Sequence, residues 1–170
     1  MSPAVRGVGV DTVELGAFAA SLGEPGTRFA TAFSATERRQ CRERAEARGV
    51  GRGAATARAD GPDARTSSSS DRSDPLARHL AARWAVKEAV VKAWSSALYG
   101  SPPPIAPDLL VWSEIETVCD AWGRPAIRLG GEVARQVAAT VGEGARWHVS
   151  LSHDGDAAVA FVVLEGQGSG

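Results

Sequence analysis

Cysteine and long hydrophobic runs are both scarce in this chain. Only Cys41 and Cys119 occur among its 170 residues, far apart and without the spacing of a zinc site or a redox pair, which favours a reducing compartment. No run of apolar residues is long enough to cross a bilayer, and the N-terminus lacks the charged start and apolar block of a signal peptide. These absences predict a soluble cytoplasmic protein with no membrane association.

An excess of charge of one sign is also missing. The 19 Lys and Arg residues nearly balance the 20 Asp and Glu residues, so the formal net charge is −1 and no overall basic field attracts nucleic acid. The charge is uneven, however, because residues 28–83 are rich in Arg, which suits an acidic protein partner.

Large apolar side chains are almost absent from residues 49–73. This stretch repeats Gly, Ala, Asp and Arg and then contains a run of serines at 67–70. Burial cannot offset the entropy lost on ordering such a segment. The parts on either side look too small to fold alone, so we predict a single domain over residues 1–170 that carries a disordered insertion at about 49–73.

A central helix is the strongest local prediction. Asp74 and Pro75 form a typical helix start, and the next stretch is the longest one free of Gly and Pro that is dense in apolar and charged residues. Its large apolar residues recur at three-, four- and seven-residue steps: Leu76, Leu80, Trp84, Val91 and Leu98. We therefore predict a helix with one buried side from about Asp74 to Leu98.

The charges of this helix are Arg83, Lys87, Glu88 and Lys92. A carboxylate among three cations on an otherwise apolar helix has two interpretations. The cations extend their charged ends from a core helix to solvent, with Glu88 in a surface ion pair, or the four residues belong to a functional site.

Shorter elements flank the helix. The pattern predicts strands at 5–13, 109–118, 126–129, 147–152 and 157–164, and helices at 15–22, from Ser34 to about Arg48, and at 132–140. The strand at 157–164 is apolar throughout, so we expect both of its faces to be covered. Ser34 and Glu37 have the spacing of a capping box.

Two polar residues at strand ends have open interpretations. Asp11 interrupts an apolar strand that carries Gly7 and Gly9, and it is either a strand-end or helix-capping residue or a carboxylate for a metal or phosphate site. His153 comes just before an Asp-Gly turn signal and is either structural or functional.

Four fragments in order resemble the holo-acyl-carrier-protein synthases, the short type of 4'-phosphopantetheinyl transferase. They are GVGVDTVEL at 7–15, ARWAVKEAVVKAW at 82–94, Gly123-Arg124-Pro125, and HVSLSHDGDAAVAFVV at 148–163. They occur in order across nearly the whole chain, and the serine-rich insertion has no counterpart in short family members. The match is nearest to actinobacterial forms, where K-A-W replaces the commoner K-A-[FL]-G.

The resemblance implies a fold and a reaction. The fold is a compact α+β unit in which an antiparallel sheet wraps a long central helix, assembled as a homotrimer with active sites between subunits. The reaction moves the 4'-phosphopantetheine group of coenzyme A to a serine of an apo acyl carrier protein, in fatty-acid or polyketide biosynthesis, with Mg²⁺ as cofactor and adenosine 3',5'-bisphosphate as the other product.

The resemblance also implies roles for individual residues. Asp11 and Glu88 are the expected Mg²⁺ ligands, since this ion takes a few carboxylates together with substrate phosphates. Glu88 or a water is the expected base, and Lys92 is expected to neutralise or protonate the leaving phosphate. The cations Arg83 and Lys87, with His153, are the expected coenzyme A contacts.

The docking surface departs from the family pattern. Many members have Arg on the first helix where this chain has Ala17, and residues 14–22 contain no Lys or Arg. Two alternatives follow. Either other cations dock the acidic carrier, namely Arg28, Arg38, Arg39 and Arg42, or the partner is a carrier domain inside a larger synthase.

Two other functions compete with the transferase. One is a non-catalytic module that binds an acidic protein through the Arg-rich segment. The other is a nucleic-acid binder that uses Arg78, Arg83, Lys87 and Lys92, against which the near-neutral charge and Glu88 both count.

Overall fold

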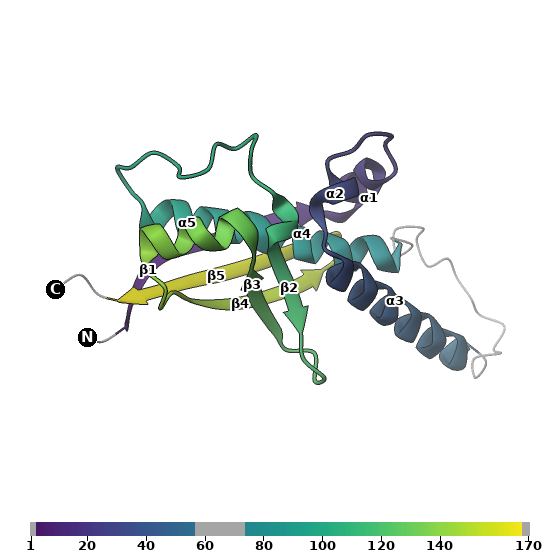
Figure 1. Ribbon diagram of the computed structural model, residues 1–170. Helices are drawn as coiled ribbons and strands as arrows, with labels where there is room; N and C mark the ends of the chain where they lie inside the picture. The colour runs from purple at the N-terminus through teal and green to yellow at the C-terminus, as the bar shows by residue number, and fades with distance from the viewer. Residues whose placement is uncertain (1–2, 57–73, 168–170) are drawn as a thin grey trace.

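Helix α4 (Pro75–Ala97) lies at the centre of the fold (Figure 1). The computed structural model describes residues 3–56 and 74–167. The other elements are β1 (Pro3–Glu14), α1 (Leu15–Leu22), α2 (Phe29–Ala32), α3 (Ala35–Thr56), the 3-10 turn η1 (Trp112–Glu114), β2 (Ile115–Cys119), β3 (Pro125–Leu129), α5 (Gly131–Val141), β4 (Arg146–Asp154) and β5 (Ala157–Gln167). No described helix is both long and apolar enough to span a membrane.

The main sheet is antiparallel, with the strand order β1-β5-β4, and β2 and β3 form a separate hairpin. Its register aligns Asp11 on β1 with Ala160 on β5, and Ala160 with Leu151 on β4. Helix α4 packs across β1 and β5, whereas α3 projects away from the body (Figure 1). This mixed α+β arrangement around a long helix confirms the predicted fold class.

Two glycines on β1 let the strand lie directly against α4. A Cβ atom on Gly9 would lie 1.9 Å from the carbonyl oxygen of Ala89, and one on Gly7 would lie 2.0 Å from that of Ala93. No side chain fits there, so the small residues of both elements set the spacing between β1 and α4. Asp11 is two residues beyond Gly9, and this contact therefore fixes its place relative to the helix.

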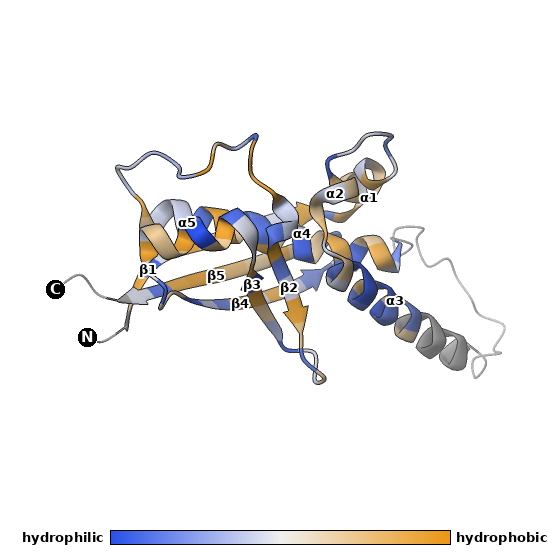
Figure 2. Cartoon of the chain, in the orientation of Figure 1, coloured by the Kyte–Doolittle hydropathy of each residue, from blue (hydrophilic) through white to orange (hydrophobic). Residues whose placement is uncertain are grey.

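The centre of α4 is buried on nearly every side, which exceeds the single buried side that its apolar spacing predicted. Its Asp74 cap is as expected, because the Asp74 Oδ1 accepts a hydrogen bond of 2.9 Å from the Leu76 amide. Arg83 and Lys87, however, are both almost completely buried. Figure 2 shows how β5 and much of α4 are apolar, in contrast to the hydrophilic described part of α3.

Lys87 forms a buried ion pair with Glu37, at the start of α3. The Lys87 Nζ lies 2.8 Å from Glu37 Oε2 and also donates to the carbonyl oxygens of Trp112 and Ile115. Glu37 closes the predicted capping box with Ser34, and its Oε1 accepts from the amide of Thr117 at 2.9 Å. One carboxylate therefore joins α3, α4 and β2.

Two predicted boundaries and one prediction about burial were wrong. Residues 109–114 of the predicted strand are not a strand, because the turn η1 precedes β2, which begins only at Ile115. Helix α3 runs on to Thr56, so an irregular segment does not start at 49; residues 57–73 of the predicted insertion lie outside the described residues. Strand β5 is not covered on both faces, since Phe161 is 48% exposed within this chain.

The exposed face of β5 continues onto β1 as an apolar surface. Val10 pairs with Phe161 and Val8 with Val163 across the two strands, and Val8, Val10 and Phe161 are all exposed. We call this surface, formed by Val8, Val10, Val159 and Phe161, the outer sheet face. Exposed clustered apolar side chains of this kind mark an interaction surface.

Candidate active site

Asp11, Glu88 and Lys92 meet where β1 passes α4. Glu88 and Lys92 are one helical turn apart, so they project from the same side of α4. The Lys92 Nζ lies 2.7 Å from Asp11 Oδ1 and 3.1 Å from the carbonyl oxygen of Val10. The Lys92 side chain is 55% exposed and the Asp11 side chain only 11%, so the pair lies at a surface with its carboxylate inside.

The Asp11 carboxyl contributes to a large shift in the pKa of Glu88. Burial, followed by the adjoining Asp11 carboxyl, raises the pKa of Glu88 to about 7, while Arg28 and Lys92 act in the opposite direction. A strongly shifted carboxyl beside a second carboxyl and a lysine is typical of functional sites.

This carboxylate pair fits a divalent cation. The Asp11 Oδ2 is buried and receives no hydrogen bond from a cation, amide or hydroxyl of the described residues, so the adjoining Glu88 carboxyl, when protonated, is the group that shares its lone pairs. Mg²⁺ takes one or two carboxylates and completes its coordination with phosphates and waters. No group of three His, Cys, Asp or Glu in the described ranges could hold a metal ion, so a substrate would have to supply the other ligands.

An aromatic wall with a cation on it borders Glu88. The Arg28 guanidinium carbon lies 5.0 Å from the ring centroid of Trp84 and 5.2 Å from that of Phe29. Trp84 in turn packs on Trp112 with ring centroids 4.6 Å apart. The sequence suggested Arg28 only as a docking cation. In the fold, its charge lies close enough to Glu88 to oppose the rise in the pKa of that carboxyl.

A shallow pocket of about 240 Å³ opens onto Glu88 from the side of α1. We call it the entry pocket. It is lined by residues of β1, α1 and the aromatic wall: Thr12, Val13, Glu14, Ala17, Phe18, Ser21, Phe29, Trp84 and Glu88. The pocket offers a direct approach to the Glu88 carboxyl.

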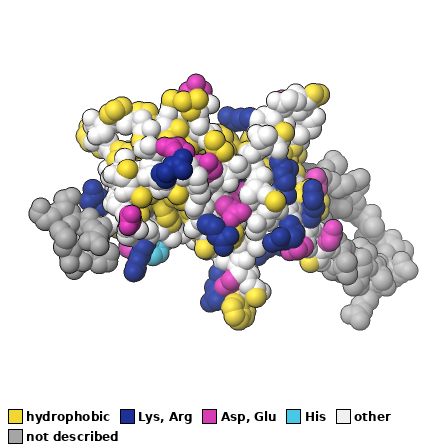
Figure 3. Space-filling model, in the orientation of Figure 1, with side chains coloured by type: hydrophobic (Ala, Val, Ile, Leu, Met, Phe, Trp, Pro, Cys, Tyr) yellow, Lys and Arg dark blue, Asp and Glu magenta, His cyan; other side chains and the backbone are white. Residues whose placement is uncertain are grey.

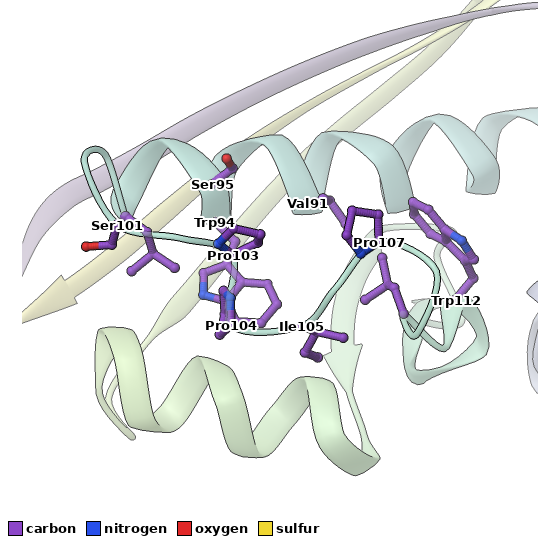
Figure 4. Close-up of a pocket in the computed structure, with 11 residues that line it drawn as sticks. Val91, Trp94, Ser95, Ser101, Pro103, Pro104, Ile105, Pro107 and Trp112 are labelled. Carbon is purple, nitrogen blue, oxygen red and sulfur yellow. The ribbon is translucent and has the colours of Figure 1, made fainter.

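A larger apolar groove of about 350 Å³ follows the same helix past Lys92. Helix α4 contributes Val91, Trp94, Ser95 and Leu98, and the proline-rich segment at 101–112 forms the opposite wall. In Figure 4 Trp94 projects between the helix and Pro103 and Pro104, and Val91 faces Pro107. Ser95 is three residues after Lys92, so the groove begins next to the lysine.

Arg83 and His153 lie away from this cluster. Arg83 lines a different cavity of about 170 Å³ with Arg44 and Cys119, and its buried Nε has no hydrogen-bond partner among the described residues. The His153 Nε2 lies 3.1 Å from the carbonyl oxygen of Arg78. Arg44 was not singled out by sequence reasoning, because nothing distinguishes it from the other arginines of α3.

Lys87 lies neither in the cluster of Asp11, Glu88 and Lys92 nor in the cavity lined by Arg83. Its side chain is fully buried and held by Glu37, which leaves it no access to a phosphate group. The geometry of the single chain therefore gives no support to the sequence-based prediction that Lys87 contacts coenzyme A. Burial also lowers the pKa of Lys87, although Glu37 opposes the shift. Lys87 is adjacent to Glu88 in sequence, but its side chain points about 100° away around the helix, into the enclosed interior.

Comparison with known proteins gives a consistent result. The model of the 4'-phosphopantetheinyl transferase superfamily matches residues 7–162. The holo-[acyl-carrier-protein] synthase of Corynebacterium glutamicum is 43% identical over 157 residues, covering 92% of this chain and 96% of the relative. That of Mycobacterium ulcerans is 40% identical over 162 residues, covering 95% and 97%.

Solved structures agree with the sequences. The ACPS–CoA complex of Chronobacterium ammoniagenes superposes with a TM-score of 0.75 at 38% identity, covering 98% of this chain and 99% of that one. The acyl carrier protein synthase of Mycobacterium tuberculosis gives a TM-score of 0.63 at 32% identity, covering 96% and 100%. With the family model matched over nearly its whole length, this chain belongs to the 4'-phosphopantetheinyl transferase superfamily.

Proposed function

We propose that this protein transfers the 4'-phosphopantetheine group of coenzyme A to a serine of an apo acyl carrier protein. The observation that carries the proposal is the meeting of Asp11, Glu88 and Lys92 at one point, with a buried Asp11 oxygen that no cation, amide or hydroxyl of the described residues binds. The holo-[acyl-carrier-protein] synthases that match over more than nine-tenths of the chain support the same reaction. They do not support a non-catalytic module for acidic proteins.

The reaction joins the serine Oγ to the phosphorus that bears pantetheine and breaks the bond from that phosphorus to the bridging oxygen. Asp11 and Glu88 would hold Mg²⁺ through their carboxylates. The ion, when bound, neutralises charge on the pyrophosphate. Glu88, or a water beside it, would accept the proton of the serine hydroxyl. Lys92, exposed at the edge of the cluster, then compensates the negative charge on the departing adenosine 3',5'-bisphosphate.

The apolar groove is the proposed site of the pantetheine arm. It starts beside Lys92, where the pyrophosphate would lie, and Val91 to Leu98 extend for about 10 Å along the helix at 1.5 Å per residue. Its walls are apolar apart from the hydroxyl groups of Ser95 and Ser101. This combination suits a thin chain of methyl, methylene and amide groups.

The nucleotide end of coenzyme A needs cations, and we assign it to Arg83 with His153. Arg83 is five residues before Glu88, which turns it about 140° around the helix at 3.6 residues per turn. One chain therefore presents two half-sites in different directions. One half-site contains Arg83 and His153, and the other contains Asp11, Glu88 and Lys92. A homotrimer that pairs one subunit's Arg83 with its neighbour's Glu88 satisfies both, and the outer sheet face supplies an apolar surface for assembly.

Intact-protein mass spectrometry tests the reaction. An apo acyl carrier protein incubated with this protein, coenzyme A and Mg²⁺ should gain the mass of one phosphopantetheine group. Omitting the metal, or replacing Asp11 by Asn and Glu88 by Gln together, should prevent the gain. A carrier that stays at its apo mass with the unaltered protein would refute the transferase, and an active double variant would refute the site.

A further inference from the structure

A small cavity of about 170 Å³ beside Arg83 contains the more exposed of the chain's two cysteines. Cys119 lies in its wall at the end of β2, and its Sγ accepts a hydrogen bond of 3.6 Å from Arg83 Nη2. We call this cavity, lined by Arg44, Arg83 and Cys119, the arginine cavity. Any group attached to the Cys119 sulfur would therefore occupy space that Arg83 lines.

Helix α3 brings a second arginine to the same cavity. The Gln40 side chain binds both the amide and the carbonyl oxygen of Cys119 at 3.1 Å, which fixes α3 against β2. Arg44 is one helical turn beyond Gln40, so it projects from the same side of α3. Its Nη2 would lie 3.2 Å from a Cβ on Gly123, in the turn that follows Cys119. Figure 3 shows how cations, in dark blue, gather over α3.

No carboxylate cancels this charge at the arginine cavity. The described residues that line it include no Asp or Glu. Asp120, next to Cys119 in sequence, is bound by Arg124, whose Nε lies 2.6 Å from Asp120 Oδ2. The Nε of Arg83 is buried and has no hydrogen-bond partner among the described residues. The cavity therefore offers two guanidinium groups to a small anion, and one of them is incompletely hydrogen-bonded.

The other cysteine lacks these features. Cys41 is 0% exposed, and burial raises the pKa of its thiol to about 11, so little thiolate forms at neutral pH. The thiolate is the form that attacks a disulfide. Cys119, in contrast, is partly exposed. The chain thus contains its own comparison between an accessible thiol beside cations and an enclosed one.

We propose that Cys119 is a site of reversible modification, which holds a small anionic thiol as a mixed disulfide in the arginine cavity. The Cys119 thiol loses its proton to solvent, and its sulfur attacks one sulfur of an anionic disulfide. A new S–S bond forms and the old one breaks, so Cys119 is oxidised and the departing half is reduced to a thiolate. Arg44 and Arg83 favour an anionic adduct over a cationic one.

The consequence for activity rests on the proposed function, which assigns the nucleotide end of coenzyme A to Arg83. The adduct fills space beside the Arg83 guanidinium and places a negative charge there. An adduct and a nucleotide phosphate cannot both occupy this space, so modification excludes coenzyme A. Reduction of the mixed disulfide releases the adduct and restores the site.

Two thiosulfonates of opposite charge test the modification site without a transfer assay. Methanethiosulfonates with a sulfonatoethyl or a trimethylammonioethyl group both form a mixed disulfide and release methanesulfinate. With each rate divided by that of the same reagent toward free mercaptoethanol, the anionic reagent should react about tenfold faster at 50 mM salt and lose most of this advantage at 500 mM. Intact mass should show one adduct per chain, and Cys119→Ser should show none.

Matched variants locate the charge that directs the reagent. Arg44→Gln should slow the anionic reagent about threefold or more and reduce its advantage over the cationic one. Arg39→Gln removes the same charge from an exposed position of α3, where Arg39 lies 3.7 Å from Glu43, and should leave both rates unchanged. Cys41→Ala should keep the adduct. Labelling of Cys41 instead, no preference for the anionic reagent, or equal effects of the two arginine variants would overturn the site.

Binding of adenosine 3',5'-bisphosphate tests the consequence. In calorimetry the anionic adduct should weaken binding about tenfold or more, and dithiothreitol should restore it. Transfer to an apo carrier should fall and recover in parallel. Undiminished binding by the fully modified protein, or no binding by the unmodified one, would overturn the exclusion of coenzyme A. Blocked binding in a protein that never adds mass to a carrier would instead leave the modification intact and overturn the transferase.

Discussion

At the residue scale, Glu88 determines how the proposed metal site depends on pH. Its pKa of about 7 means that the carboxyl is largely protonated in mildly acidic solution, so a divalent ion must displace that proton. We expect Mg²⁺ affinity to increase from pH 6 to pH 8, with proton release on the acidic side. Calorimetry in buffers of different ionisation enthalpy measures both quantities. Glu88→Gln should weaken binding and abolish its pH dependence; binding that is equal at both pH values would contradict the assignment.

The same shift has a consequence for stability without metal. Because the folded-state pKa of Glu88 is raised above the ordinary value of 4.5, its contribution is fully present below pH 4.5 and is lost as the pH rises through about 7. Metal-free Glu88→Gln cannot ionise there, so its melting temperature should fall less between pH 5 and pH 8 than that of the unaltered protein. Thermal melts at the two pH values test this, and Mg²⁺ should stabilise only the unaltered protein.

Lys87 illustrates a cation with a structural role. Removing one member of a buried ion pair leaves the other charge without compensation, so Lys87→Met should reduce the free energy of unfolding by about 3–5 kcal/mol. The double change with Glu37→Gln should recover part of that loss. Denaturant melts measure both. Lys92→Met is the matched control: its side chain is 55% exposed, so stability should change little while turnover falls. Equal stability of the two Met variants would contradict the buried-pair account.

At the element scale, the contact between β1 and α4 positions the proposed catalytic groups. A Cβ on Gly9 would lie 1.9 Å from the Ala89 carbonyl oxygen, so Gly9→Ala must push the two elements apart. We expect a stability loss of about 1–3 kcal/mol, typical of overpacking, and a larger fall in kcat than in stability because Asp11 moves relative to Glu88. Gly23→Ala is the control, since a Cβ there would meet its nearest neighbour, the Ala20 carbonyl oxygen, at 3.5 Å. Unchanged turnover in Gly9→Ala would show that this spacing is not critical.

Elements with strong local signals were predictable from the sequence. Asp74 and Pro75 mark the start of α4, and the capping box of Ser34 and Glu37 marks that of α3. Residues 109–111 were wrongly predicted as a strand, because an apolar run in which Leu110 lines a groove while Leu109 and Val111 are exposed looks the same in sequence as a strand. Periodicity also could not show that the cations of α4 divide between opposite sides, because the partner of Lys87 lies 50 residues away.

The candidate site was predictable only in part. Asp11 and Glu88 could be predicted as site residues because burying a carboxylate in an apolar element costs free energy, and the family resemblance suggested that they act together. Neither line of reasoning could place Arg28 over the ring of Trp84, since that contact depends on how α2 folds back onto α4. The groove along Val91 was equally hidden, because its second wall comes from a segment without regular structure.

At the scale of the whole molecule, the two proposed half-sites make a prediction about mixed assemblies. If each active site takes Arg83 from one subunit and Asp11 from the next, Arg83→Ala chains and Asp11→Asn chains are each inactive alone. Random equimolar mixing then pairs intact groups in about one site in four, so about a quarter of the normal transfer rate should return. Since Arg83 is buried, His153→Ala serves as a second variant in case Arg83→Ala fails to fold.

The recovery must depend on assembly through the outer sheet face. Phe161 is 48% exposed in the single chain and is surrounded on this face by Val8, Val10 and Val159. A glutamate at this position would therefore bury an unpaired carboxylate if a second subunit packed against the face. Phe161→Glu in both chains should therefore give monomers by light scattering and no recovery on mixing, while circular dichroism stays that of a folded protein. Activity in each single variant before mixing would show that one chain contains a complete site; recovery that persists among monomers would remove the sheet face from the interface.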